Sequence, residues 1–174
     1  MRIAIIGYSG SGKSTLAMRL GEAYNLPVLH FDKVQFRPNW EIRPQQSKEV
    51  MTKAFMDLHH EWVIDGNYSK LSFERRMEEA DVIILLLFNR LSCLCRVTRR
   101  YRKYKDSTRG DMADGCKEKL DREFVKWVLW KGRSKEARAR YESVCARYPE
   151  KTFVIKNQRQ LNRVQKRIEE LRRK

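Results

Sequence analysis

The residues with the clearest chemical purpose stand near the start of the chain, in the sequence GYSGSGKS from Gly7 to Ser14. Glycines at this spacing let the backbone curl around an anion, with N–H groups pointing inward as a nest for phosphate. Lys13 adds a positive charge for the outer phosphates, and the hydroxyl of Ser14 is a suitable ligand for Mg²⁺. The spacing fits G-x-x-x-x-G-K-[ST], a P-loop, and therefore predicts a site for ATP. The ATP-binding residues predicted from this segment are Gly7, Tyr8, Ser9, Gly10, Ser11, Gly12, Lys13, Ser14 and Thr15.

Two aspartates, Asp32 and Asp65, each follow a short apolar run that is typical of a strand, at residues 28–31 and 62–64. A P-loop site needs a carboxylate to hold the metal or its water shell, and the end of a neighbouring strand is the usual place for it. We predict that Asp65 supports Mg²⁺ together with Ser14, and that Asp32 orients the acceptor or serves as the general base. Because Asp is also common in turns and at helix starts, a capping role is the alternative for each.

Basic residues are concentrated in the second half of the chain. Residues 90–174 hold 27 of the 38 Lys and Arg residues against 11 acidic ones, and carry the whole net charge of +16. We predict that arginines of this half neutralise charge on a phosphoryl group during its transfer. Arg96 and Arg100 are one helical turn apart and Arg99 is adjacent, although a solvated basic face is the alternative. The full set of predicted catalytic residues is Lys13, Asp32, Arg96, Arg99, Arg100 and Arg109.

The order of the segments predicts an α/β domain with a mostly parallel sheet, because short apolar runs alternate with amphipathic stretches. No linker or internal repeat divides the chain, which predicts a single domain over residues 1–174. Residues 32–46 are typical of a loop. Residues 105–117 contain two glycines and are expected to close over ATP, within a lid of about residues 91–118. The expected strands are residues 2–6, 28–31, 62–64, 82–88 and 152–155.

Composition excludes several classes of protein. With 41% hydrophobic and 10% aromatic residues, the chain of 174 residues is too apolar to be a disordered basic tail. Its longest apolar run, residues 82–88, falls far short of the roughly 18 residues of a membrane-spanning helix. The N-terminus lacks the pattern of a signal peptide, so we expect a cytoplasmic protein with no membrane partner.

Three further segments carry a family resemblance: HFD at residues 30–32, IDGNY at 64–68 and RGDMADGC at 109–116. With the P-loop, they make the chain resemble the adenylate-kinase-like P-loop kinases, and most closely the bacterial DNA topology modulation proteins. The resemblance implies a P-loop NTPase fold of the nucleoside monophosphate kinase type. In that fold a five-stranded parallel sheet of order 2-3-1-4-5 is flanked by helices and carries an Arg-rich lid. It also implies ATP with Mg²⁺, the adenine being held by Arg96 and by Asn157 after the last strand.

The motif and the resemblance together predict a phosphotransferase like the nucleotide and nucleoside kinases, which uses ATP and Mg²⁺ on an unidentified small-molecule acceptor. One departure concerns that acceptor. Adenylate kinases continue the Asp-Gly of the third strand with Phe-Pro-Arg, whose arginine grips a monophosphate, whereas Asn67-Tyr68-Ser69 follows here. The candidate acceptor residues are Arg37, Trp40, Asn67 and Arg75.

The basic second half supports an alternative function, a DNA-associated P-loop protein in which ATP is a switch or a vestige. No helix-turn-helix, zinc-finger or RNA-recognition motif is found in the sequence, so charge is the only physical support for nucleic acid as a partner.

Two other patterns predict packing rather than chemistry. Cys93 and Cys95 have one residue between them, too few for a structural zinc site, and are expected to pack a helix. Trp127 and Trp130 are expected in the core rather than as a platform for stacking bases.

Overall fold

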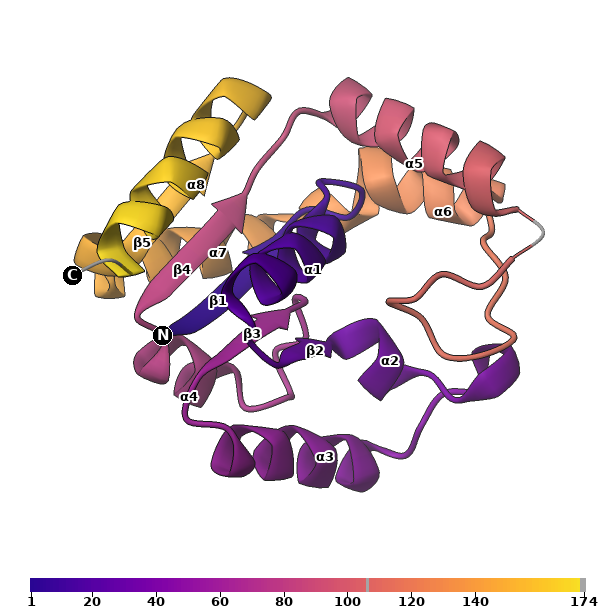
Figure 1. Ribbon diagram of the computed structural model, residues 1–174. Helices are drawn as coiled ribbons and strands as arrows, with labels where there is room; N and C mark the ends of the chain where they lie inside the picture. The colour runs from indigo at the N-terminus through magenta and orange to yellow at the C-terminus, as the bar shows by residue number, and fades with distance from the viewer. Residues whose placement is uncertain (106, 173–174) are drawn as a thin grey trace.

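A computed structural model, which describes residues 1–105 and 107–172, shows a five-stranded sheet in the order β2-β3-β1-β4-β5 (Figure 1). Each neighbouring pair of strands is parallel. The strand order and the parallel arrangement confirm the predicted fold. The strands are β1 (Arg2–Gly7), β2 (Val28–His30), β3 (Trp62–Asp65), β4 (Val82–Leu86) and β5 (Thr152–Ile155).

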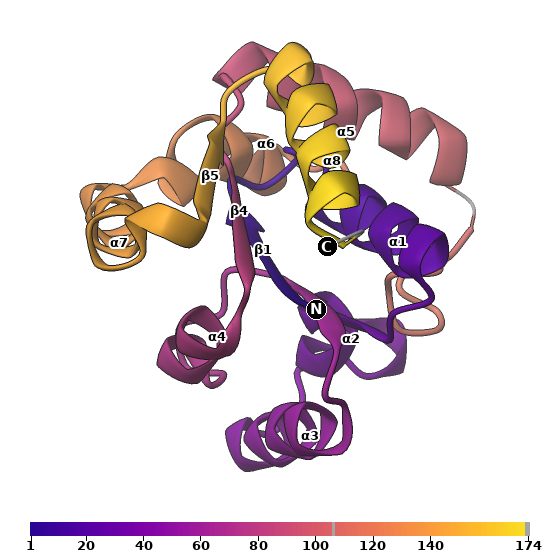
Figure 2. The same cartoon turned by 60° about the vertical axis from the view of Figure 1, so that its left-hand side comes forward.

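Helices cover both faces of this sheet. Seen nearly edge-on, the sheet has α1 and α8 on one face and α4 and α7 on the other (Figure 2). None of the helices in the described part of the chain is long and apolar enough to cross a membrane. The helices are α1 (Lys13–Tyr24), α2 (Phe31–Gln35), α3 (Gln45–Leu58), α4 (Phe73–Glu79), α5 (Arg90–Tyr104), α6 (Arg122–Leu129), α7 (Lys135–Arg147) and α8 (Gln158–Arg172).

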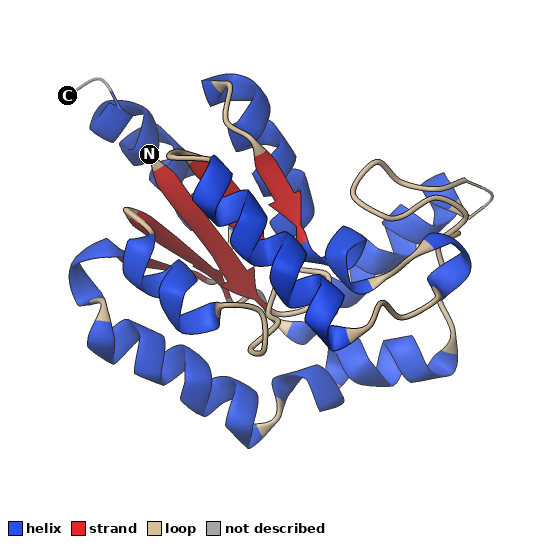
Figure 3. Ribbon diagram, turned by 90° about the horizontal axis from the view of Figure 1, so that it is seen from below, coloured by secondary structure: helices blue, strands red, loops and turns tan. Residues whose placement is uncertain are grey.

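The core lies in and around the central strands. All five residues of β4 are buried, as are the last five of β1, because helices lie against both faces of the sheet. This is why both strands consist of continuous apolar residues instead of alternating with polar ones. The register places Ile5 of β1 beside Asp65, and Asp65 beside His30 of β2. The P-loop and the residues that end β2 and β3 therefore meet at one edge of the sheet, the edge to which the carboxyl ends of the parallel strands lead. Figure 3 shows the strands and the surrounding helices from below.

Two local predictions were wrong. Residues 32–46 are not all loop, because Asp32 lies in the first turn of the short helix α2. Trp127 and Trp130 are not in the core, since they are 50% and 57% exposed. The helix α6 buries Val128, and Trp127, the residue before Val128, lies about 100° around the helix and is turned outward.

The predicted lid begins with α5 and continues as a loop to the start of α6. An isolated antiparallel bridge joins Thr108 to Lys117 within it, and Asp106 lies outside the described residues. The loop packs on the segment after α2: the amide of Asn39 donates to the carbonyl of Asp114 at 3.2 Å, and the amide of Trp40 donates to Sγ of Cys116 at 3.2 Å. The loop is thus held against the region before α3 and does not extend into solvent.

Candidate active site

The P-loop curves tightly between β1 and α1. Gly7 has φ of +134°, and a Cβ there would lie 2.2 Å from the carbonyl oxygen of Leu86, so only glycine fits. Gly12 precedes α1 with a left-handed backbone. The ammonium of Lys13 donates to the carbonyls of Gly7 and Tyr8, both at 3.1 Å, and so spans the loop. Burial lowers the pKa of Lys13, and the carboxylates of Asp65 and Asp32 oppose that shift.

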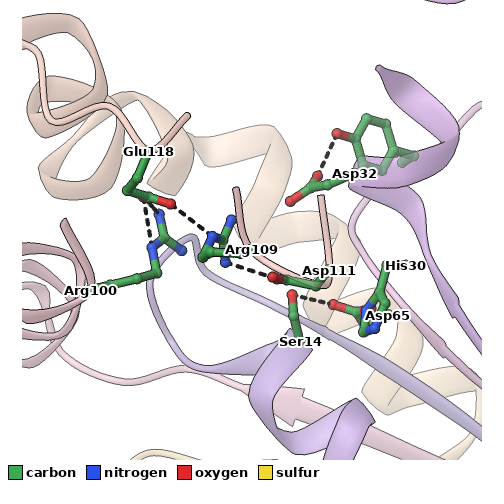
Figure 4. Close-up of polar contacts among 9 residues, drawn as sticks. Ser14, His30, Asp32, Asp65, Arg100, Arg109, Asp111 and Glu118 are labelled. Atoms are coloured by element: carbon green, nitrogen blue, oxygen red, sulfur yellow. Dashed lines mark hydrogen bonds and ion pairs between the residues drawn. The ribbon is translucent and has the colours of Figure 1, made fainter. Parts of the chain in front are cut away.

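Asp65 connects the P-loop helix to β2. The hydroxyl of Ser14 donates to Oδ2 of Asp65 at 2.8 Å, and Nδ1 of His30 lies 2.5 Å from Oδ1 (Figure 4). The structure therefore brings together the two residues that the sequence assigned to Mg²⁺. No cluster of three or more His, Cys, Asp or Glu side chains suited to a metal occurs among the described residues. One carboxylate and one hydroxyl fit Mg²⁺, which keeps several waters and takes its other ligands from phosphates.

Asp32 faces the same end of the sheet from α2. The hydroxyl of Tyr68 donates to Oδ1 of Asp32 at 2.8 Å. Burial raises the pKa of Asp32, while the hydrogen bond from Tyr68 lowers it. Burial and the neighbouring Asp32 raise the pKa of Tyr68, so this phenol remains a donor. A carboxylate with a raised pKa is a stronger base than an exposed one, which suits a proton acceptor.

Arg96, the first of the predicted lid arginines, lies over the P-loop. It donates to the carbonyl of Ser11 at 3.1 Å and to the side chain of Gln158 at 3.0 Å. Its guanidinium also sits 4.2 Å from the ring centroid of Phe88. Arg96 thereby joins the P-loop to the start of α8. There the side chain of Asn157 accepts a hydrogen bond from the backbone N–H of Gln160 and caps the helix.

Arg100 and Arg109 share one carboxylate. Glu118 accepts from Nε of Arg100 at 2.8 Å and lies 2.7 Å from Nε of Arg109 through its other oxygen. Asp111 accepts from Arg109 at 2.8 Å (Figure 4). Burial lowers the pKa of Arg100, and the charge of Arg109 adds to that shift. The two carboxylates hold both arginines within the lid.

One cleft of about 1300 Å³ runs along this edge of the sheet. Eleven basic and three acidic side chains line it, so its electrostatic field favours an anionic ligand. The predicted residues that line it are Ser9, Gly10, Gly12, Lys13, Ser14, Thr15, Asp32, Asp65, Asn67, Arg96, Arg99, Arg100 and Arg109.

Several predicted residues lie elsewhere. The ring of Tyr8 packs under the guanidinium of Arg133, 3.9 Å from its centroid, and so belongs to the support of the P-loop. Within the part of the chain that the structure describes, the predicted residues outside the cleft lining are Gly7, Tyr8, Ser11, Arg37, Trp40, Arg75 and Asn157.

Of the four acceptor candidates, the structure brings only Asn67 to the cleft. Its amide group bonds both backbone groups of Gly7, accepting from the N–H at 2.8 Å and donating to the carbonyl at 2.5 Å. Arg37 pairs with Glu41. Trp40 packs edge-on against Phe36. Arg75 instead pairs with Asp57 and Glu79.

Sequence reasoning missed a buried arginine beside the site. Arg76 is 0% exposed and donates to the carbonyls of Gly66, Leu71 and Tyr68 at 3.0–3.2 Å. Burial lowers its pKa to about 9, although the charge of Asp65 opposes that shift. The signal was present, since Arg76 shares the helical spacing of the buried residues Phe73 and Met77.

Because Arg76 organises the segment that carries Asn67 and Tyr68, Arg76→Ala is expected to lower the free energy of unfolding by about 3 kcal/mol or more. Three carbonyls lose a donor, and each unsatisfied buried polar group costs about 1 kcal/mol or more. Arg75→Ala is the matched control, and loss of its exposed ion pairs is expected to cost less than about 1 kcal/mol. Urea unfolding measures both variants, and equal effects would contradict the structural role of Arg76.

The sheet order, the P-loop between β1 and α1, and the lid define a P-loop NTPase fold of the nucleoside monophosphate kinase type. No model of a known protein family and no curated protein matches the sequence.

Solved structures of kinases share this fold. One is deoxyadenosine kinase from M. mycoides with the products dCMP and dCDP bound. It aligns with this chain at a TM-score of 0.54 and 12% sequence identity, and the alignment covers 98% of this chain and 100% of that one. Another is shikimate kinase from Acinetobacter baumannii in complex with shikimate. It aligns at a TM-score of 0.59 and 12% sequence identity, over 98% of this chain and 92% of that one.

Proposed function

We propose that this protein is a kinase that transfers the γ-phosphoryl group of ATP to the hydroxyl group of a small molecule, with Mg²⁺ as cofactor. The observation that carries the proposal is the arrangement at the sheet edge. Lys13 spans the P-loop, Ser14 bonds Asp65, and a second carboxylate, the half-buried Asp32, lines the same cleft. Phosphoryl transfer is catalysed chiefly by positioning and by charge stabilisation, and this cleft offers both.

Each residue then has a separate task. The P-loop amides and Lys13 bind the β- and γ-phosphates, and Ser14 and Asp65 would hold Mg²⁺. When bound, Mg²⁺ neutralises charge on the phosphate oxygens. Asp32 accepts the proton of the acceptor hydroxyl as its oxygen bonds to the γ-phosphorus, and the bond from that phosphorus to the bridging oxygen breaks to release ADP. Arg96 and Arg99 supply positive charge around the transferred group, and Arg100 and Arg109 line the same cleft while they pair with Glu118 and Asp111.

The fold adds support by analogy alone, because the kinases named above share only 12% of their residues with this chain. The resemblance of the sequence to DNA topology modulation proteins agrees with the same P-loop kinase fold. A nucleic-acid partner remains a hypothesis supported by the net charge of +16.

The proposal predicts ADP release that depends on both Mg²⁺ and an acceptor. The protein is incubated with ATP and a panel of nucleosides, nucleotides and hydroxy acids, with and without EDTA, while ADP is followed by a coupled assay. Phosphorus NMR then identifies the phosphorylated product. Absence of ATP binding by calorimetry, together with absence of ADP release in the whole panel, would refute the proposal.

A further inference from the structure

One wall of the cleft holds a cation with no part in the phosphate site described above. Lys48 of α3 is 8% exposed and lines the cleft. Its ammonium donates to Oε1 of Gln35 at 2.9 Å. Among the described residues no carboxylate lies within ion-pair distance of Lys48, whereas Arg100 in the lid has one and Arg109 has two. Because its hydrogen-bond partner Gln35 is a neutral amide, the charge of this ammonium remains available to an anion from outside the chain.

The position of Gln35 shows where that anion would lie. Gln35 and Asp32 are three residues apart on α2, hence on one face of the helix, and both line the cleft. The wall therefore carries the carboxylate of Asp32, on which the charge of Lys13 in the P-loop acts, and the ammonium of Lys48, which bonds Gln35 of the same helix as Asp32.

We infer that the acceptor is an alcohol bearing an anionic group, a carboxylate or a phosphate, and that Lys48 with Gln35 binds this group while Asp32 faces the hydroxyl. The inference rests on the proposed kinase function and specifies its substrate class. It also explains why Arg37 and Arg75 are not required, because both are neutralised by carboxylates of their own. An uncharged alcohol would leave Lys48 buried without a counter-charge.

The test uses simple anions while the ATP subsite is filled. The protein is saturated with Mg²⁺ and a non-hydrolysable ATP analogue. Its melting temperature is then measured against inorganic phosphate or acetate, with sodium chloride keeping the ionic strength constant. We expect a rise of about 3 °C at ten times the Kd of the better anion. A stronger effect of phosphate indicates a phosphorylated acceptor, and a stronger effect of acetate indicates a carboxylic acid.

Variants of Lys48 show whether this residue is responsible. Lys48→Met removes the charge and keeps the aliphatic stem, so the response to the anion should disappear, whereas Lys48→Arg should keep it. Lys53→Met, on the exposed side of the same helix, is the control and should behave as wild type. If Lys48→Met does not fold, Lys48→Gln provides a neutral variant that can still bond Gln35.

The outcomes separate the two proposals. The inference would be overturned if the neutral variants still responded to the anion. It would also be overturned if wild type bound the ATP analogue but did not respond to the anion. Either result would leave the kinase function standing. Failure of the analogue itself to stabilise wild type, with no difference from Lys13→Ala, would overturn the proposed function.

Discussion

Replacing Lys13 with alanine is expected to lower kcat for phosphoryl transfer by about 10²–10³-fold, as loss of one transition-state charge contact does in other enzymes. In the structure the ammonium of Lys13 bonds the carbonyls of Gly7 and Tyr8, so it already lies at the P-loop, where the phosphates are expected to bind. Steady-state kinetics with the best acceptor measures the effect.

The same substitution should leave the fold intact, because Lys13 lines an open cleft and water can enter the space that its side chain leaves and replace the lost donor. Lys53→Ala, an exposed position on α3, is the control for the removal of one positive charge. A Lys13→Ala variant with wild-type circular dichroism and wild-type kcat would show that the P-loop takes no part in transfer.

Asp32→Asn is the second large expected effect, with a loss of about 10²–10⁴-fold in kcat if Asp32 takes the proton of the acceptor. The pKa of Asp32 is raised by burial, so the wild-type rate should fall on acidification at a higher pH than an exposed aspartate would give. Tyr68→Phe removes the hydrogen bond that lowers this pKa, and should move the acid limb to still higher pH. If Tyr68→Phe had the same pH profile as the wild-type enzyme, Asp32 would not be the base.

Although Asp32→Asn should lower kcat, it should raise the stability of the fold at neutral pH. A carboxyl with a raised pKa in the folded state binds its proton more tightly there than in the unfolded chain. Its contribution to stability is therefore greatest at low pH and is lost as the pH rises through the folded pKa. The asparagine variant should melt above wild type at pH 7, and the difference should shrink as the pH approaches 4. A variant less stable than wild type at pH 7 would show that the ionised carboxylate is well compensated.

Several features of the site could be predicted from the sequence because they are local. The glycine spacing before Lys13 and Ser14 sets a backbone shape that binds phosphate, and this shape depends on few distant residues. The positions of Asp32 and Asp65 after apolar runs predict strand ends, and the structure has Asp65 as the last residue of β3 and Asp32 two residues after the end of β2. Parallel strands align those ends at one edge, which is why the meeting of Ser14 with Asp65 could be anticipated.

The remaining features depend on which face of an element turns toward the cleft. Arg75 and Arg76 are adjacent and chemically identical, yet one pairs with carboxylates at the surface and the other is buried against backbone carbonyls. Trp127 was expected in the core and is half exposed, because α6 turns the neighbouring Val128 inward instead.

The sequence by itself determined the strand order through the resemblance, the P-loop and the concentration of positive charge in residues 90–174. Only the tertiary structure decided which charges remain available. Arg100 and Arg109 are matched by Glu118 and Asp111 in the lid, whereas Lys48 lines the cleft and has no carboxylate partner among the residues that the structure describes. The physical reason is that ion pairing and burial depend on three-dimensional neighbours far apart in the sequence.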